Sequence, residues 1–331
     1  VSVAVHLLNL LCIPAIALVF AYRKFPGMNV WKSLATLAVS FGVIVLVLYG
    51  LVPGFIKVAQ VFELFCVNTC GMGYNVGVLI YAAVTVCVFI WCLHELYRQK
   101  SANGIRISFI LTVAFSGMLC FTSSGWVWLL LLAALAAVMY TVFRRGLPVR
   151  VLTVIAWSIA VIFVGYSSYA LILIRSAADT PMNQNAPSDI FTLRTYLARE
   201  QYGKVPLLYG QTYVSEVQRE NQGGSCVPVT TEGEPTWSRV IKKDKNEKDR
   251  YFVSRTDQEY KYVDELNMLF PRMYSSDPRH VQAYKEWAQV KGQPVKYNYC
   301  GEMKSVMKPT FAENLKFFFS YQLNFMYWRY F

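Results

Sequence analysis

Arg175 stands where a long apolar stretch ends and a polar stretch, which runs to Asp189, begins. An Arg side chain at a membrane surface can pair with phosphate through its charge and its parallel hydrogen-bond donors. The same position also suits an anchor whose charged end reaches water while its methylene groups stay among the lipids. We therefore treat Arg175 as a candidate phosphate contact, with the anchoring role as the alternative.

Metal-ligating side chains do not cluster in the sequence. The histidines, His6, His94 and His280, lie far apart, and the eight cysteines include no CxxC pair. Zinc sites need such ligands at short spacings, so we expect no metal site and no cofactor. Cys226 and Cys300 are the only cysteines of the polar region, and in an oxidising compartment they can form a disulfide. The sequence leaves this pairing open.

Six apolar segments come close to the ~20 residues that cross a hydrocarbon core: residues 1–22, 33–52, 77–96, 107–121, 125–143 and 151–174. They predict a polytopic α-helical membrane protein with about six spans. Basic residues gather in every second gap between these segments, at 23–32, 98–106 and 144–150. Because short loops rich in Lys and Arg stay cytoplasmic, the polar region after the last span is predicted to be extracytoplasmic.

The positive net charge of +12 does not indicate a nucleic-acid-binding protein. Up to Arg175 there are 11 Lys and Arg residues against 2 acids, whereas the rest of the chain has 21 against 18. Most of the excess therefore reflects membrane topology. The one dense basic run, at 242–250, alternates with acids, which is typical of a solvated hairpin tip. We expect no nucleic-acid partner.

The predicted domains follow this division. Residues 1–175 form the transmembrane region, in which an interrupted apolar segment near 53–75 predicts a helix lying along the outer interface. Residues 176–309 predict a small α+β extracytoplasmic domain, with helices at 188–201 and 277–289 and a hairpin of residues 237–241 and 250–255. From residue 310, a capping box of Thr310 and Glu313 begins an aromatic helix that either lies at the interface or re-enters the membrane.

Several segments resemble a bacterial family of polytopic membrane proteins, domain of unknown function 2723. They are residues 165–210, FPRMYS at 270–275, PTFAENL at 309–315 and YWRYF at 327–331. That family is similar to the transmembrane protein O-mannosyltransferases of the lipid-phosphosugar-using (C-type) glycosyltransferase class. The resemblance implies a multi-pass protein of the bacterial inner membrane with residues 176–309 in the periplasm.

It also implies a reaction and its partners. A sugar such as mannose would pass from a polyprenyl-phosphate-linked donor to a protein or glycan acceptor, such as a Ser or Thr hydroxyl, on the extracytoplasmic side of the lipid bilayer. Arg175 would contact the donor phosphate. The matched segment also contains four candidates for the acceptor side: Asp189, Arg194, Glu200 and Tyr202. For each of them a plain folding role is the alternative.

The class to which the resemblance points carries its catalytic acid in the first outer loop. The sequence has no such loop, and its first residue, which is not Met, already lies in an apolar run. We therefore expect a piece of a longer protein and assign no catalytic residue. Two other classes of function stay open, a membrane transporter or flippase and a non-catalytic envelope assembly protein. Few ionisable groups lie within the spans, which argues against ion-coupled transport.

Overall fold

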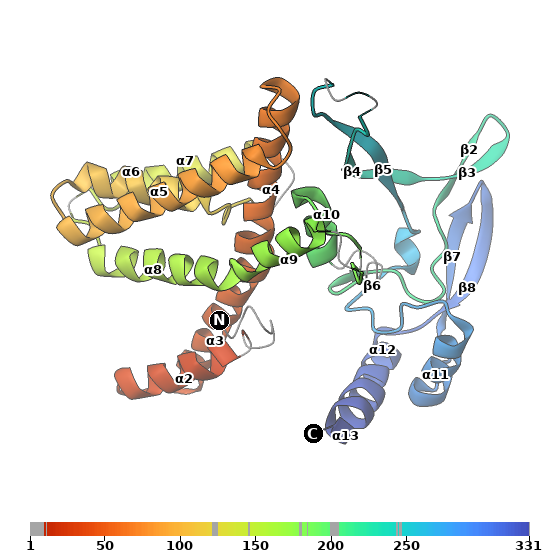
Figure 1. Ribbon diagram of the computed structural model, residues 1–331. Helices are drawn as coiled ribbons and strands as arrows, with labels where there is room; N and C mark the ends of the chain where they lie inside the picture. Colours follow the sequence, from red (N-terminus) through yellow and green to blue (C-terminus); the bar gives the residue numbers. More distant parts are fainter. Residues whose placement is uncertain are drawn as a thin grey trace. The chain divides into compact units, whose positions relative to one another are not determined.

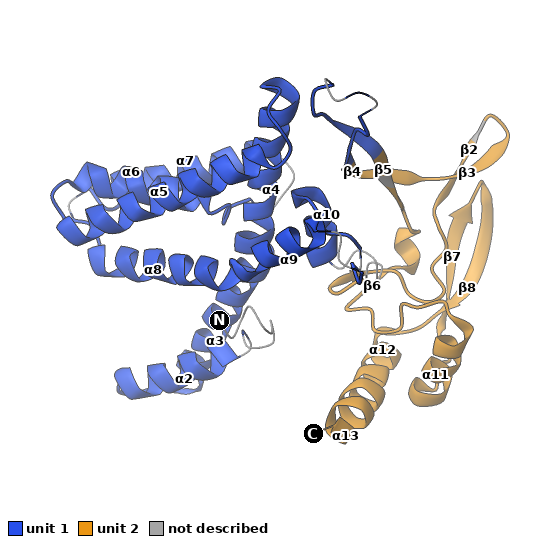
Figure 2. Ribbon diagram, in the orientation of Figure 1, with its two compact units in different colours: residues 1–201, 237–254 blue, residues 202–236, 255–331 orange. Residues whose placement is uncertain are grey.

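The apolar segments of the sequence form helices in the structure, a computed structural model that describes residues 10, 12–120, 125–144, 146–178, 181–183, 185–198, 205–242, 244 and 247–330. The chain divides into two units (Figure 2). Unit 1 comprises residues 1–201 and 237–254, and unit 2 comprises residues 202–236 and 255–331. This division does not follow the predicted domain boundary at residue 175, because the following helix and the hairpin tip belong to unit 1. The sidedness on which that boundary depends stays a prediction.

Unit 1 is mainly helical. Its helices, most of which are labelled in Figure 1, are α2 (Cys12–Lys24), α3 (Val30–Val45), η2 (Leu46–Leu51), α4 (Val52–Leu64), η3 (Phe65–Thr69), α5 (Val76–Arg98), α6 (Ala102–Phe115), α7 (Gly125–Thr141), α8 (Val149–Tyr166), α9 (Ser168–Ala177) and α10 (Ile190–Ala198). Helix α5 packs against α6 and α8, and α6 packs against α7. In Figure 1 helix α4 runs at a large angle to this group.

Three of the described helices are long and apolar enough to cross a membrane: Val30–Thr69, Val76–Arg98 and Val149–Ala177. Two shorter apolar helices, Ala102–Phe115 and Gly125–Thr141, fall at predicted spans but have only 14 and 17 residues. Residues 1–9 and 11 of the predicted first span lie outside the described residues. The described helices are consistent with a membrane protein and support three spans, and they do not support the expected count of six.

The first long helix continues past Pro53, where the sequence predicted the beginning of a separate interfacial helix. Proline lacks an N–H and its ring crowds the preceding turn, so a regular α-helix breaks or kinks there. Here the π-helical turn η2 stands immediately before α4, with Pro53 in the first turn of α4. A wider turn relieves this crowding, and α3, η2, α4 and η3 therefore form one helix, Val30–Thr69.

Glycines allow the helices of unit 1 to approach closely. A Cβ on Gly77, in the first turn of α5, would lie 2.6 Å from the Glu63 Cα of α4. A Cβ on Gly54 would overlap the carbonyl oxygen of Gly117, in the turn after α6. Around these contacts lies a core that includes Ile56, Tyr81 and Phe191. Helix α4 is thus packed on both α5 and α10.

Unit 2 is rich in strands. Its strands are β1 (Tyr209–Gly210), β2 (Arg219–Gln222), β3 (Ser225–Pro228), β6 (Met268–Leu269), β7 (Gln293–Tyr299) and β8 (Glu302–Lys308), and they pair antiparallel as β1–β6, β2–β3 and β7–β8. Its helices are η5 (Asp264–Leu266), α11 (Pro278–Ala288), α12 (Phe311–Phe317), η6 (Phe318–Tyr327) and α13 (Trp328–Tyr330). Helix α11 confirms the predicted helix at 277–289.

The predicted hairpin is confirmed and is longer than expected. Strands β4 (Thr230–Arg239) and β5 (Tyr251–Tyr260) form a two-stranded sheet whose tip belongs to unit 1 and whose base belongs to unit 2. The capping box is also confirmed. The Thr310 hydroxyl accepts the Glu313 N–H, and the Glu313 carboxylate accepts the Thr310 N–H.

A disulfide links two of the hairpins in unit 2. Cys226 of β3 is bonded to Cys300, in the turn between β7 and β8, and their Cα atoms are 5.9 Å apart. The pairing that the sequence left open is therefore made. Since structural disulfides persist in oxidising compartments, this bond agrees with the predicted extracytoplasmic position of unit 2.

Candidate functional site

Asp189 is buried at the beginning of helix α10, where its two carboxylate oxygens make different contacts. Its Oδ1 accepts the backbone N–H groups of Phe191 at 3.0 Å and Thr192 at 2.8 Å, and also the Thr192 hydroxyl at 2.9 Å. These are the contacts of a helix N-cap, which satisfies amides that have no partner within the helix. Its Oδ2 lies 3.3 Å from the Arg239 Nε. The structure thus gives this predicted site residue a folding role.

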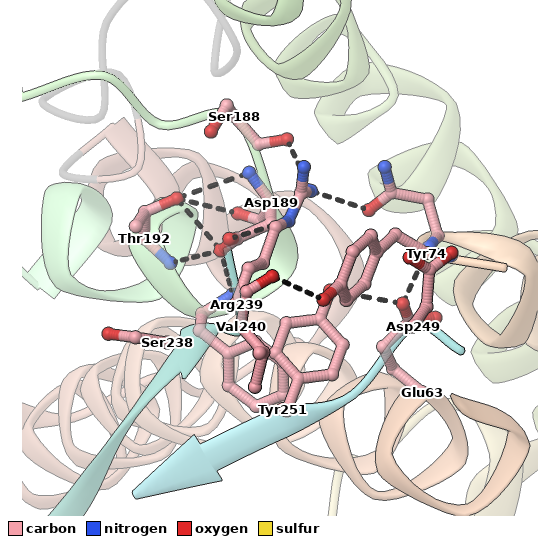
Figure 3. A network of polar contacts seen from close by, with 12 residues as sticks. Glu63, Tyr74, Ser188, Asp189, Thr192, Ser238, Arg239, Val240, Asp249 and Tyr251 are labelled. Carbon is pink, nitrogen blue, oxygen red and sulfur yellow. Dashed lines mark hydrogen bonds and ion pairs between the residues drawn. The ribbon is translucent and has the colours of Figure 1, made fainter. Parts of the chain in front are cut away.

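Arg239 joins the hairpin tip to this cap. Its Nε is at ion-pair distance from Asp189 but lacks hydrogen-bond geometry. Its terminal NH2 nitrogen donates to the Ser188 carbonyl at 3.2 Å, and the guanidinium lies 4.9 Å from the centre of the Tyr74 ring (Figure 3). An Arg plane over an aromatic face gains from the charge distribution of the ring. Arg239 therefore holds strand β4 against both α10 and the loop before α5.

Glu63 is a fully buried carboxylate of helix α4 that caps a neighbouring helix. Its Oε1 accepts the Asn75 N–H at 2.6 Å, and its Oε2 accepts the Val78 N–H at 3.1 Å. The first N–H groups of a helix have no intrahelical acceptor and carry partial positive charge. Glu63 satisfies two such groups at the beginning of α5.

Tyr251 of strand β5 also binds the Glu63 carboxylate. Its hydroxyl donates to Oε1 at 3.2 Å (Figure 3). Burial, followed by the nearby Glu63 charge, raises the pKa of Tyr251 well above its usual range. The phenol therefore stays protonated at neutral pH and remains a donor to the carboxylate. Helix α4, helix α5 and the hairpin meet at this one group.

The segment between α4 and α5, which comprises η3 and the loop after it, binds the backbone of the hairpin through side chains. Asn68 donates to the Tyr251 carbonyl at 3.1 Å and accepts the Tyr251 N–H at 2.8 Å, as a neighbouring strand would. The Tyr74 hydroxyl accepts the Arg250 N–H at 3.2 Å. The Asp249 carboxylate accepts the Tyr74 N–H at 3.2 Å and pairs with Lys242 at 2.7 Å. Figure 3 shows Tyr74 and Asp249 beside Tyr251 of the hairpin.

This polar network acts mainly as a clamp, because most of its donors and acceptors bind each other. We call it the hairpin clamp: Glu63, Asn68, Tyr74, Asn75, Asp189, Arg239, Asp249 and Tyr251. Within the part of the chain that the structure describes, no group of three or more His, Cys, Asp and Glu side chains could hold a metal ion. The role of the hairpin clamp is therefore to hold α4, α5, α10 and the hairpin in position.

The remaining predicted residues are placed separately. Arg175 lies exposed in the last turn of α9, at the end of the apolar helix Val149–Ala177. Arg194 lies in α10, close enough to Lys57 of α4 for the two cations to interact electrostatically. Helix α10 is held on α4 by a hydrogen bond from the Gln60 amide to the Ile190 carbonyl, 3.3 Å long. Glu200 and Tyr202 lie outside the described residues.

Sequence reasoning missed most of the hairpin clamp, although one signal was present. Lys57, Gln60, Glu63 and Asn68 interrupt an apolar stretch, and the first three recur at intervals of three residues, which makes successive ones neighbours on the surface of a helix. Such polar interruptions of an apolar stretch predict an interfacial helix. Gln60, Glu63 and Asn68 instead bind groups in α10, α5 and the hairpin.

Unit 2 contains a second network of polar contacts. It joins two of the segments that resemble domain of unknown function 2723. The buried Asn314 accepts the Arg272 N–H at 2.8 Å and donates to the Phe270 carbonyl at 2.8 Å. The Arg272 guanidinium lies 4.2 Å from the centre of the Phe270 ring and donates to the Leu207 carbonyl at 3.0 Å. The segments 270–275 and 309–315 thus form one local structure.

Comparison with known proteins gives a family match for part of the chain. A family model described as a family of unknown function (DUF8416) matches residues 203–319, which is less than half of the chain. No curated protein and no solved structure matches. These comparisons do not test the expected resemblance to domain of unknown function 2723 and to the O-mannosyltransferases, which stays a prediction. What they show is that most of unit 2 and the hairpin tip are similar to a family without an established function.

Proposed function

We propose that the chain is part of a membrane glycosyltransferase that moves a sugar from a polyprenyl-phosphate-linked donor to an acceptor on the extracytoplasmic side. The observation that carries the proposal is the position of Arg175. Its guanidinium is exposed in the last turn of an apolar helix long enough to cross a bilayer. At a membrane surface that position gives the donor phosphate a fixed charge and paired hydrogen-bond donors.

Two further cations support the proposal. Lys57 and Arg194 come from the packed helices α4 and α10 and are close enough to interact. Fixed positive charge stabilises the negative charge that develops on a departing phosphate. Within this proposal Arg194 contributes to the phosphate side as well as to the acceptor side for which the resemblance suggested it. Asp189 serves as the cap that holds α10 in place.

The proposal also includes a topology. Helices α6 and α7 and the segment that ends in α2 cross the bilayer together with the three long helices, which gives six spans, in the inner membrane of a bacterium. The disulfide of unit 2 favours the oxidising side of the membrane for that unit.

The test uses membranes that contain the full-length protein and a radiolabelled polyprenyl-phosphate sugar. We expect transfer to an acceptor, and we expect Arg175→Ala to weaken donor binding by about tenfold, because one charge-assisted hydrogen bond contributes about 1.5–3 kcal/mol. Arg98→Ala is the matched control. Arg98 is also an exposed Arg in the last turn of a candidate span, and its loop is predicted to be cytoplasmic. An absence of transfer, or unchanged donor affinity of the Arg175 variant, would rule the proposal out.

The transporter or flippase alternative has less support. It calls for an ionisable side chain that can exchange protons or ions within a span. Glu63 is a buried acid within a candidate span, but the backbone of α5 and the Tyr251 hydroxyl occupy its carboxylate. The envelope assembly alternative predicts that the full-length protein transfers no sugar, and the same assay distinguishes it.

A further inference from the structure

The last helical segment of unit 2, which comprises α12, η6 and α13, packs on α11 through aromatic residues. Phe317 packs on Tyr284 of α11, with ring centres 4.9 Å apart. Tyr321 and Phe325 pack on Trp287 at 5.3 and 4.9 Å. These contacts hold α12 and η6 against α11.

The residues after Phe325 are exposed although four of the five are large and apolar or aromatic. We call residues 326–330 the aromatic end: Met326, Tyr327, Trp328, Arg329 and Tyr330. Exposed fractions are 55% for Tyr327 and Trp328 and 85% for Tyr330. A helix at the surface of a soluble protein places polar residues on its exposed side. The aromatic end has only Arg329 for that purpose, so water is a poor surrounding for it.

We propose that the aromatic end inserts into the headgroup region of a lipid bilayer. Tyr and Trp combine an apolar ring with a hydrogen-bonding group, which suits a boundary between hydrocarbon and water. Arg329 lies 5.4 Å from the centre of the Phe325 ring, and from the interface its guanidinium can reach lipid phosphate. The composition therefore fits the interface better than a re-entrant segment, which would need the Arg charge to enter the hydrocarbon.

Unit 2 is covalently tethered to the unit that contains the candidate spans. The backbone crosses between the units at 201/202, 236/237 and 254/255, and unit 1 contains the three helices that could cross a membrane. A covalent tether raises the effective concentration of a weakly binding surface. A contact too weak to hold a free protein on a membrane therefore suffices here. This inference is independent of the proposed enzymatic activity.

The test places a photoreactive benzophenone side chain at Tyr330 of the full-length protein. The protein is reconstituted in vesicles of phosphatidylethanolamine and phosphatidylglycerol, irradiated, and analysed by mass spectrometry. Met303 is the control position, because it is an exposed apolar residue of unit 2 on strand β8, between two charged neighbours. We expect lipid adducts at position 330 to exceed those at 303 about tenfold, given the strength of aromatic burial.

The other outcomes overturn the proposal. Crosslinks between two copies of the chain at position 330 would identify the aromatic end as an interface between copies. An equal lipid yield at 330 and 303 would show only random collisions with the bilayer. A lack of lipid adducts at 330 would show that the aromatic end lies away from the bilayer.

Discussion

At the scale of single residues, the buried carboxylate of Glu63 connects more of unit 1 than any predicted site residue does. It binds two backbone amides of the α5 terminus and the phenol of Tyr251. These groups come from segments up to 188 positions apart in the sequence. A donor that loses its acceptor in a buried place costs its full desolvation free energy.

Removing this carboxylate should therefore destabilise unit 1. We expect Glu63→Ala to lower the free energy of unfolding by about 3 kcal/mol and Tyr251→Phe by about 1 kcal/mol, since the first variant leaves buried donors unpaired and the second removes one donor. Thermal unfolding of the detergent-solubilised protein measures both. Glu302→Ala, at an exposed position on β8, should change little. Equal stability of the Glu63 and Glu302 variants would contradict the capping role.

Glu313 gives unit 2 a pH-dependent stability. Burial by itself would raise the pKa of this carboxyl group, but hydrogen bonds from the N–H groups of Thr310, Lys291 and Gly292 outweigh it and lower the pKa below its ordinary value. The unfolded chain then binds the proton more readily than the folded chain. The stabilisation is therefore fully present above the unfolded-state pKa and is lost as the pH falls through the lower folded-state pKa.

A titration of thermal stability can show this. We expect the unfolding temperature of the wild-type protein to fall below a pH of about 4.5, the ordinary range for Glu, and we expect Glu313→Gln to weaken this dependence. The variant should also be less stable at neutral pH, where wild-type Glu313 is charged. Parallel acid curves for the two proteins would refute the assignment to Glu313.

At the scale of elements, the packing of α4 on α5 depends on a position without a side chain. Gly77→Ala would place a Cβ 2.6 Å from the Glu63 Cα and 2.7 Å from the Phe62 carbonyl oxygen. Backbone atoms cannot give way as a flexible side chain can, so the helices must separate. We expect a loss of about 1–3 kcal/mol in the free energy of unfolding, as is usual for overpacking.

The matched control is Gly42→Ala in α3. A Cβ at this position meets nothing within 4 Å, and Ala favours a helix over Gly by up to about 1 kcal/mol. This variant should be neutral or more stable than the wild-type protein. Both variants are compared by thermal unfolding in the same detergent, and a stable Gly77 variant would show that α4 and α5 are not tightly packed.

Elements built from local signals were predictable from the sequence. The capping box of Thr310 and Glu313, helix α11 and the hairpin of β4 and β5 follow from cap residues, helical spacing and strand-like runs. The lengths of the spans were harder to predict. Apolar composition does not reveal where a helix ends, so residues 107–121 and 125–143 gave spans where the structure has helices of 14 and 17 residues. Pro53 suggested a break that a π-helical turn avoids.

At the scale of the whole molecule, the division into units could not be read from the sequence. The tip of the hairpin belongs to unit 1 because Asn68, Tyr74 and Glu63 bind its backbone and side chains across more than 160 positions. Such contacts depend on which surfaces meet after folding, and no local spacing encodes them. Of the candidate site residues, Asp189 lies at the beginning of the helix that was predicted at 188–201, whereas its contact with Arg239 was not foreseen.

The disulfide of unit 2 provides a way to measure on which side of the membrane this unit lies. Cys226 is exposed and is bonded to Cys300 across 74 positions, so the bond should stabilise unit 2 by about 2–4 kcal/mol. We expect Cys226→Ser with Cys300→Ser to lower the unfolding temperature, and a reductant to have the same effect on the wild-type protein but not on the double variant.

Labelling of the reduced thiols then reports the compartment. After mild reduction of cells whose outer membrane has been made permeable, a membrane-impermeant maleimide should label Cys226 if unit 2 is extracytoplasmic. The variant with both serines corrects for Cys12, Cys70 and Cys87, which are also exposed. Labelling only after the inner membrane is broken would place unit 2 in the cytosol. Arg175 directly precedes this polar region, so it would then lie at the cytosolic surface of the membrane. It could not bind the phosphate of a donor sugar at the outer surface.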